Sequence, residues 1–267
     1  MAQEELYFAL ILAIIQGITE WLPISSSGHL VLAERFLGYH GGGLTFDVAL
    51  HFGTLMAVFV YFGKDIIDIL QDLFRLKLNS ENGKLGILLI VASVPAGIVG
   101  FLVKDYFESV LSNLWVVAVG FGVTGMFLLI AAVYRIPSSE GKEKFSKFGY
   151  KRAFLVGIVQ AISIVPGISR SGSTMAAGVL AGLNEKNAMK FSFLMAIPVV
   201  FGANILTVGQ STLPSELIWA SFVSFLVGLL TIHVLFKYVL VKRKNLIWFG
   251  VYCLILAILL GSWLVLA

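Results

Sequence analysis

Residues 166–174 read Pro-Gly-Ile-Ser-Arg-Ser-Gly-Ser-Thr and separate two apolar segments, 154–165 and 175–182. The Pro-Gly pair interrupts a helix, and the residues after it place Arg170 and four hydroxyl groups between the two segments. An arginine at membrane depth is costly, and it usually faces a cavity or a partner. A structural kink capped by serines would explain the break, but a kink does not require an arginine. We therefore interpret this stretch as half of a functional site.

The composition places the chain in a membrane. Of its 267 residues 58% are hydrophobic and 13% are charged, and the mean hydropathy is +0.94. These values lie outside the range of soluble globular proteins and indicate an integral membrane protein. The net charge of +4 comes from basic residues in short loops, which a membrane surface explains without a nucleic-acid partner. The single cysteine, Cys253, excludes a disulfide framework.

A second interrupted segment lies near the N-terminus. Residues 6–22 are apolar but carry Gln16 and Glu20, which are four residues apart and share one face of a helix. Pro23 ends this helix, and Ile-Ser-Ser-Ser-Gly follows at 24–28. The next piece, 29–38, is only about 15 Å long at 1.5 Å per residue, so it cannot cross a bilayer. We expect residues 6–38 to form a re-entrant hairpin around a polar interior.

The two halves of the chain are related. With an offset of 144, Gln16 and the 24–28 motif align with Gln160 and residues 168–172, and with an offset of 139, residues 49–63 align with 188–202. The sequence predicts an all-α integral membrane protein with a single membrane domain, 1–267. Its first inverted repeat is 1–135, its cytoplasmic linker is 136–152 and its second inverted repeat is 153–267. Each repeat holds one re-entrant hairpin (about 6–38 and 153–183) and three transmembrane helices, six in all: 46–62, 85–103, one ending near Tyr134, 188–206, 215–236 and 246–266.

Basic residues set the expected orientation. If both termini lie on one face, all of the 19 lysines and arginines except Arg35, Lys104 and the embedded Arg170 fall on the opposite face. Basic loops stay in the cytoplasm. We therefore predict a multi-pass protein of the cell (plasma) membrane with both termini extracytoplasmic.

An inverted repeat would bring the two hairpin tips together. Each short second helix begins at its serine-rich tip, so its positive end and free N–H groups favour an anion, and Arg170 adds donors suited to phosphate oxygens. Glu20 suits a hard cation that bridges phosphates, or general acid–base chemistry. His29 suits proton transfer or attack on phosphorus. This mixture indicates a phosphoester or phosphoanhydride site at a membrane.

The motifs at 16–29 (Gln-Gly-Ile-Thr-Glu-Trp-Leu-Pro-Ile-Ser-Ser-Ser-Gly-His) and 166–174 resemble the two signatures of the undecaprenyl-diphosphate phosphatase family, the bacitracin-resistance type, over essentially the whole chain. The resemblance implies hydrolysis of a polyprenyl diphosphate to the monophosphate carrier lipid and inorganic phosphate on the outer face, with a divalent cation (Mg or Ca). Gln16 stands where many members carry glutamate. The resemblance gives Glu20 the metal or acid–base role, Ser26 and His29 the catalytic positions of the first motif, and Ser169, Arg170 and Thr174 the phosphate-binding positions of the second. Together with the other polar residues expected at the two tips, the predicted site has catalytic Glu20, Ser26, His29 and Arg170, with Glu20 also the metal ligand, and substrate-binding Gln16, Ser25, Ser27, Ser169, Ser171, Ser173 and Thr174.

Several alternatives stay open at this point. A transporter or flippase for a lipid phosphate would use the same inverted-repeat cavity. The nucleophile is either His29 or a serine. His51 lies on an apolar face away from either tip motif, and we interpret it as a packed, hydrogen-bonded histidine. The expected partners are the polyprenyl diphosphate and membrane lipids, and a homodimer is one oligomeric state that the sequence permits.

Overall fold

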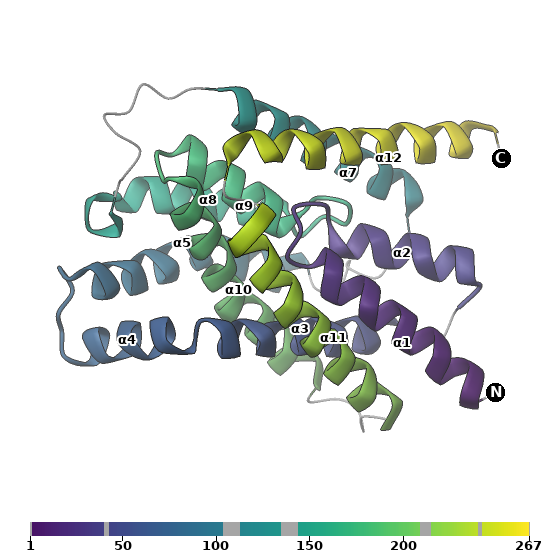
Figure 1. Cartoon of the computed structure of the whole chain (residues 1–267), viewed down its shortest axis with the longest axis horizontal. Helices are drawn as coiled ribbons and strands as arrows, with labels where there is room; N and C mark the ends of the chain where they lie inside the picture. Colours follow the sequence, from purple (N-terminus) through teal and green to yellow (C-terminus); the bar gives the residue numbers. More distant parts are fainter. Residues whose placement is uncertain are drawn as a thin grey trace.

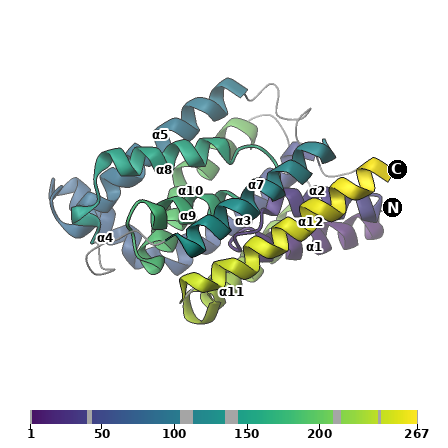
Figure 2. The same ribbon diagram turned by 90° about the horizontal axis from the view of Figure 1, so that it is seen from above.

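A computed structural model describes residues 2–39, 43–103, 113–134, 144–208, 215–239 and 242–266, and this part of the chain is helical without any strand. Both termini lie at one end of the molecule, opposite the turn between α4 and α5 (Figures 1 and 2). The helices are α1 (Ala2–Thr19), α2 (Ser26–Leu37), α3 (Gly43–Tyr61), α4 (Gly63–Phe74), α5 (Glu81–Val103), α7 (Leu114–Val133), α8 (Tyr150–Ile162), α9 (Arg170–Leu180), α10 (Glu185–Val208), α11 (Ser215–Val234) and α12 (Leu246–Leu266).

The two interrupted segments form helix–turn–helix hairpins at the predicted places. α1 packs against α2, and α8 packs against α9. In each hairpin a serine caps the second helix, because the Ser25 Oγ accepts from the Gly28 N–H at 3.3 Å and the Ser169 Oγ accepts from the Gly172 N–H at 3.0 Å. The breaks predicted from Pro23 and from the Pro166 motif are therefore present, with the helices starting at the serine-rich tips.

Among the described residues, four helical stretches are long and apolar enough to cross a membrane: Glu81–Val103, Leu114–Val133, Leu217–Val239 and Arg243–Leu266. A fifth candidate is the pair Thr45–Tyr61 and Gly63–Phe74, which bends by 76°. The charged residues between the expected spans 46–62 and 85–103 (Lys64, Asp65, Arg75, Lys77 and Lys84) predict a loop there. This prediction was wrong for residues 63–74, which form helix α4. Apolar residues at Ile66, Ile69 and Leu73 pack α4 against the core and explain why it is helical.

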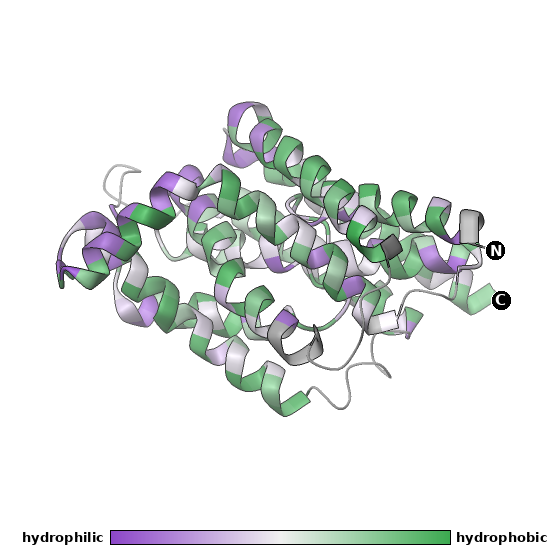
Figure 3. Cartoon of the chain, turned by 90° about the horizontal axis from the view of Figure 1, so that it is seen from below, coloured by the Kyte–Doolittle hydropathy of each residue, from purple (hydrophilic) through white to green (hydrophobic). Residues whose placement is uncertain are grey.

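Hydrophilic residues gather at the end of the molecule opposite the termini, and hydrophobic residues cover the helices between the two ends (Figure 3). Many of the large apolar side chains are exposed, including Ile90, Val119, Leu230 and Ile258. Contiguous apolar surface of this extent is unfavourable in water and suits lipid.

Helix α7 supports both hairpin tips. A methyl group added at Gly120 would lie 2.4 Å from the Pro166 carbonyl oxygen, so only glycine permits this approach of α7 to the second tip. The neighbouring Phe121 is fully buried and packs over Gly28 in the first hairpin. The tips are thus held on adjacent faces of one helix, and α12 packs along α7 from outside.

Candidate active site

The two hairpin tips contact each other. The Ser171 hydroxyl of the second hairpin donates to the Leu22 carbonyl of the first at 3.1 Å. A methyl group added at Gly172 would lie 3.0 Å from the Pro23 Cβ, which shows how closely the two turns approach. This contact brings the side chains of the two sequence motifs into one place.

Glu20 lies at the centre of this place and receives donors from three directions. Its Oε1 accepts from the Arg170 Nη2 at 2.5 Å, which is an ion pair between the two hairpins. Its Oε2 accepts from the Ser26 hydroxyl at 2.5 Å and from the Gln16 amide at 3.0 Å. Because the carboxylate is buried and surrounded by donors, its ionised form is the one that these contacts stabilise.

Arg170 is the first residue of α9 and is held on two further sides. Its Cζ lies 5.5 Å from the centroid of the buried Trp21 ring, a cation–π arrangement. Its Nη1 donates to the Ser192 carbonyl at 3.4 Å. The guanidinium therefore has a fixed position beside Glu20, at the N-terminal end of α9, where the helix dipole also favours an anion.

His51 belongs to this cluster, which the sequence did not reveal. Its Nδ1 donates to the Asp47 carbonyl at 2.8 Å, and its Nε2 lies 3.4 Å from the Glu20 Oε2. Because the Nδ1 carries a proton, a neutral ring would turn the lone pair of its Nε2 toward the carboxylate, whereas a protonated ring forms an ion pair. His51 is therefore a neighbour of the proposed site and not only a packing residue. A periodic apolar helix gives no signal for such a contact.

His29 forms a separate group. Its Nδ1 lies 2.7 Å from the Ser25 carbonyl and its Nε2 lies 2.8 Å from the Tyr252 hydroxyl. The hydrogen bonds described for His29 join it to neither Glu20 nor Arg170. Ser26 and His29 are three residues apart on α2 and share a helix face, so the fold places His29 beside the Glu20 cluster rather than in it.

The other predicted hydroxyls lie at the tips in two matching sets. Ser25 and Ser27 are 3.3 Å apart through their Oγ atoms, and so are Ser169 and Ser171. Ser25 has a φ of 70°, a backbone conformation that is strained for a serine and is typical of functional turns. Ser173 is buried, and so is Thr174, whose hydroxyl lies 2.6 Å from the Ser192 Oγ. Their expected contacts with a substrate stay predictions.

Thr124 of α7 is another residue that the sequence did not single out. Its hydroxyl donates to the Gly167 carbonyl at 3.0 Å and accepts from the Ser169 N–H at 2.9 Å. These two bonds satisfy backbone groups that the break in the second hairpin leaves unpaired. Thr124 thus supports the second tip from behind.

Two oxygen-bearing side chains at the first tip are of the kind that binds a hard cation. Glu20 supplies a carboxylate, and the Gln16 Oε1 is buried without a hydrogen-bond partner among the described residues. Amide and carboxylate oxygens are the ligands that Mg²⁺ and Ca²⁺ prefer. Within the described part of the chain, no group of three or more His, Cys, Asp or Glu side chains could hold a metal ion. A cation here would therefore take most of its ligands from a bound substrate and from water.

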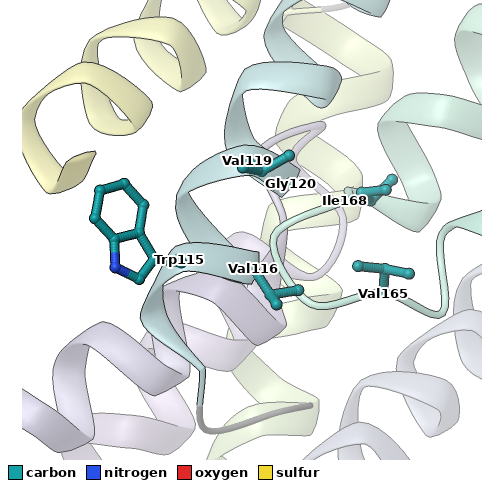
Figure 4. A pocket seen from close by; sticks show the side chains of 6 residues that line it. All are labelled: Trp115, Val116, Val119, Gly120, Val165 and Ile168. Atoms are coloured by element: carbon teal, nitrogen blue, oxygen red, sulfur yellow. The ribbon is translucent and has the colours of Figure 1, made fainter. Parts of the chain in front are cut away.

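An apolar pocket of about 270 Å³ lies next to the second tip (Figure 4). Its wall is formed by α7 on one side and by the turn between α8 and α9 on the other, through Trp115, Val116, Val119, Gly120, Val165 and Ile168. Val165 and Ile168 flank the Pro166–Gly167 break, and Ile168 directly precedes the cap of α9. The pocket is thus an apolar space beside a polar tip.

Comparison with known proteins shows the family to which the chain belongs. Residues 9–259 match the family described as "Bacitracin resistance protein BacA". The chain belongs to this family. Relatives in the BacA family include "Undecaprenyl-diphosphatase 1" of Pseudoalteromonas translucida, which is 37% identical over 93% of this chain and 95% of its own length. "Undecaprenyl-diphosphatase" of Methanosphaera stadtmanae is 39% identical over 94% of this chain and 95% of its own length.

Membership in the BacA family confirms the resemblance seen in the motifs at 16–29 and 166–174. A further relative, "Undecaprenyl-diphosphatase" of Thermosipho melanesiensis, is 39% identical over 93% of this chain and 96% of its own length. The coverage is close to complete on both sides, so the similarity includes the hairpins and the final helices. Together with the apolar helices described above, it identifies a multi-pass membrane protein.

Proposed function

We propose that this chain is a membrane phosphatase that hydrolyses undecaprenyl diphosphate, or a closely related polyprenyl diphosphate, to the monophosphate and inorganic phosphate. The observation that carries the proposal is the ion pair between Glu20 and Arg170, which joins the two family motifs at the meeting point of the hairpin tips. The names of the relatives, which are undecaprenyl-diphosphatases, supply the substrate.

Arg170 is the proposed ligand of the terminal phosphate. In the structure its guanidinium is bound to Glu20, and a phosphate with two or more negative charges competes for the same donors. The N-terminal ends of α2 and α9 begin at this point, at Ser26 and Arg170, and their free N–H groups favour the same anion. Positioning and charge neutralisation are the main requirements of phosphoryl transfer.

Glu20, Ser26 and His29 are the proposed catalytic groups on the first hairpin. Glu20 holds the Ser26 hydroxyl by a 2.5 Å hydrogen bond, so this oxygen has a base beside it. His29 has its Nδ1 bound to the Ser25 carbonyl, which leaves Nε2 as the nitrogen able to attack phosphorus or to accept a proton. The attacking group is thus Ser26, His29 or a water that one of them activates.

A divalent cation, Mg²⁺ or Ca²⁺, completes the proposed site. Glu20 and the Gln16 amide oxygen would hold it, and it would neutralise charge on the diphosphate when bound. The remaining polar side chains, Ser25, Ser27, Ser169, Ser171, Ser173 and Thr174, are the proposed substrate-binding groups or supports of the two tips.

The proposed membrane arrangement is six transmembrane helices and two re-entrant hairpins in inverted repeats. Trp115 and Tyr134 bracket α7 and lie about 29 Å apart at 1.5 Å per residue, which matches the hydrocarbon core of a bilayer. Trp219 and Tyr238 lie near the two ends of the apolar stretch Leu217–Val239 and are the same number of residues apart. Aromatic residues favour the two interfaces of a membrane, so these pairs support this placement. Thr124, which binds the second tip, then lies near the midplane.

The proposed orientation puts both termini outside. The two termini share one end of the molecule, and hydrophilic residues gather at the other (Figures 1 and 3). In the sequence, most of the basic residues belong to the face expected opposite the termini. Three of the basic residues counted for this prediction lie outside the described residues: Arg135 and Lys142 of the predicted basic face, and Lys104, an exception to it.

Cysteine labelling tests the orientation. Because the only cysteine, Cys253, is buried, a cysteine added at either terminus gives a clean reporter. A membrane-impermeant thiol reagent should label it in intact cells.

The apolar pocket supports a lipid substrate. Its wall consists of Trp115, Val116 and Val119 on the half of α7 that begins at the terminal end of the molecule, together with residues flanking the second tip. We expect the first isoprene units to lie there while the diphosphate reaches Arg170. Membrane lipids are the other expected partners. A homodimer stays a prediction, and the size of the protein in detergent tests it.

Release of inorganic phosphate by the purified protein tests the proposed function. We expect phosphate from undecaprenyl diphosphate in detergent or proteoliposomes, loss of this activity with a chelator, and loss in the Glu20→Gln and Arg170→Ala variants. The control is an exposed variant such as Tyr238→Phe, which should keep wild-type activity. Movement of lipid across vesicles without phosphate release would instead identify a flippase and overturn the proposal.

A further inference from the structure

The His29 ring is held at both of its nitrogens. The Ser25 carbonyl, 2.7 Å from the Nδ1, can only accept, so the Nδ1 carries a hydrogen. In the neutral ring the Nε2 is then an acceptor, and the Tyr252 hydroxyl at 2.8 Å must be its donor. The two rings are nearly parallel, with an interplanar angle of 8° and centroids 5.7 Å apart. The edge of the His29 ring also meets Phe121, at a centroid distance of 5.3 Å.

Tyr252 owes its position to the packing of α12 on α7. A methyl group added at Gly125 would lie 2.7 Å from the Gly250 carbonyl oxygen, so the two helices touch through their backbones two residues before Tyr252. Cys253, the next residue, is fully buried with Ile24, Val117 and Phe121. Tyr252 therefore lies on a helix whose position along α7 is fixed by packing. It is 223 residues away from His29 in the sequence.

We propose that Tyr252 is a positioning residue that controls the reactive nitrogen of His29. Because the Nδ1 is committed to the Ser25 carbonyl, only the Nε2 can attack phosphorus or exchange a proton with water or substrate. The Tyr252 hydroxyl fixes the direction of this nitrogen before the substrate arrives and releases it when a phosphate oxygen or water takes its place. This inference rests on the proposed function, in which His29 is catalytic.

A positioning role predicts a change in turnover rather than in substrate binding. For Tyr252→Phe, which removes only the hydroxyl, we expect kcat to fall about tenfold while KM changes by less than about twofold, the effect of losing one neutral hydrogen bond. Tyr238→Phe is the matched control, because it removes an exposed tyrosine hydroxyl elsewhere in the same half of the chain. Thermal unfolding in detergent should show that both variants fold as the wild type does.

A double-mutant cycle separates this role from a general structural one. If Tyr252 acts through His29, Tyr252→Phe should cause no further loss in the His29→Ala background, measured from the residual phosphate release. An equal loss in both backgrounds would overturn the proposal, and so would a Tyr252→Phe enzyme with unchanged kcat. If the wild type released no phosphate, or His29→Ala were as active as the wild type, the proposed function would be at fault instead.

A spectroscopic measurement tests the contact independently of activity. The chain has four histidines, and ¹⁵N-labelling of their rings gives separate Nδ1 and Nε2 resonances, with His29 assigned by its loss in His29→Ala. We expect the His29 Nδ1 to be protonated, and the Nε2 resonance to move in Tyr252→Phe but not in Tyr238→Phe. An Nε2 resonance that stays in place in Tyr252→Phe would show that no hydrogen bond exists there.

Discussion

The Arg170 Nη2 lies 2.5 Å from the Glu20 Oε1, although 150 residues separate them in the sequence. Each residue comes from a different hairpin, so this ion pair forms only when the two tips meet. A buried charged pair is weak evidence for stability, because desolvation offsets much of the attraction. Its position, at the start of α9 and beside Ser26, instead suits the binding of an anion.

Activity should depend on the shape of the Arg170 side chain as well as on its charge. Arg170→Lys keeps the charge but loses the planar fork that can hold two phosphate oxygens, and we expect kcat/KM to fall by roughly 10- to 100-fold. Arg170→Ala should cost more, because it also leaves Glu20 without its partner. Phosphate release at several substrate concentrations measures both variants. A lysine variant with wild-type kcat/KM would show that the planar guanidinium of Arg170 does not bind two phosphate oxygens at once.

His51 should matter through its contact with the Glu20 carboxylate. We expect His51→Leu to lower kcat/KM by about tenfold or more, because the buried carboxylate loses a polar neighbour, which is an ion-pair partner when the ring is protonated. His51→Gln can still present an N–H at this position and should keep activity within about threefold. The control is His233→Gln, since His233 is exposed and its ring contacts Tyr61 rather than Glu20. Equal activity of the leucine and glutamine variants would contradict this role.

Packing of α7 against the second tip should depend on Gly120. In Gly120→Ala the new methyl group would meet the Pro166 carbonyl oxygen at 2.4 Å, so the tip must move, at a cost of about 2 kcal/mol. The matched control is Gly122→Ala, whose methyl group would have its nearest neighbour at 3.8 Å. Unfolding temperature in detergent and phosphate release measure the two variants. The prediction fails if both are equally stable and active.

Gln16 should determine the cation concentration that half-maximal activity requires. Gln16→Glu places a second carboxylate beside Glu20, so we expect half-maximal activity at a lower Mg²⁺ or Ca²⁺ concentration than in the wild type. Gln16→Leu removes the amide oxygen and should raise that concentration. A cation titration after treatment with a chelator measures both. Identical titration curves for all three proteins would exclude Gln16 from the cation site.

Site residues that interrupt an apolar pattern are visible in the sequence, and site residues that lie within a regular pattern are not. Glu20, Ser26 and Arg170 interrupt apolar segments, and the structure brings them together. His51 and Tyr252 lie within regular apolar helices, where one polar residue is easily explained by packing. Their roles depend on the direction in which their helix faces, and a sequence without contacts does not give that direction.

Helix α4 is an element of the fold that likewise could not be predicted from the sequence without knowledge of its contacts. Charged residues such as Lys64 and Asp65 led to the expectation of a loop, yet Ile69 and Leu73 lie on one face and pack against α5 near Gly86. Tertiary burial of that face stabilises the helix, because short helices gain most of their stability from packing.

Composition and broken apolar segments by themselves determined that this chain is helical, lies in a membrane and carries two polar tips. Those properties depend on short-range chemistry, namely transfer to lipid, helix breaking and capping, and a sequence records them directly. Only the tertiary structure decided that Glu20 binds Arg170, that His51 stands beside them and that Tyr252 holds His29. Hydrogen bonds act over about 3 Å, so these partners are fixed by how the helices pack.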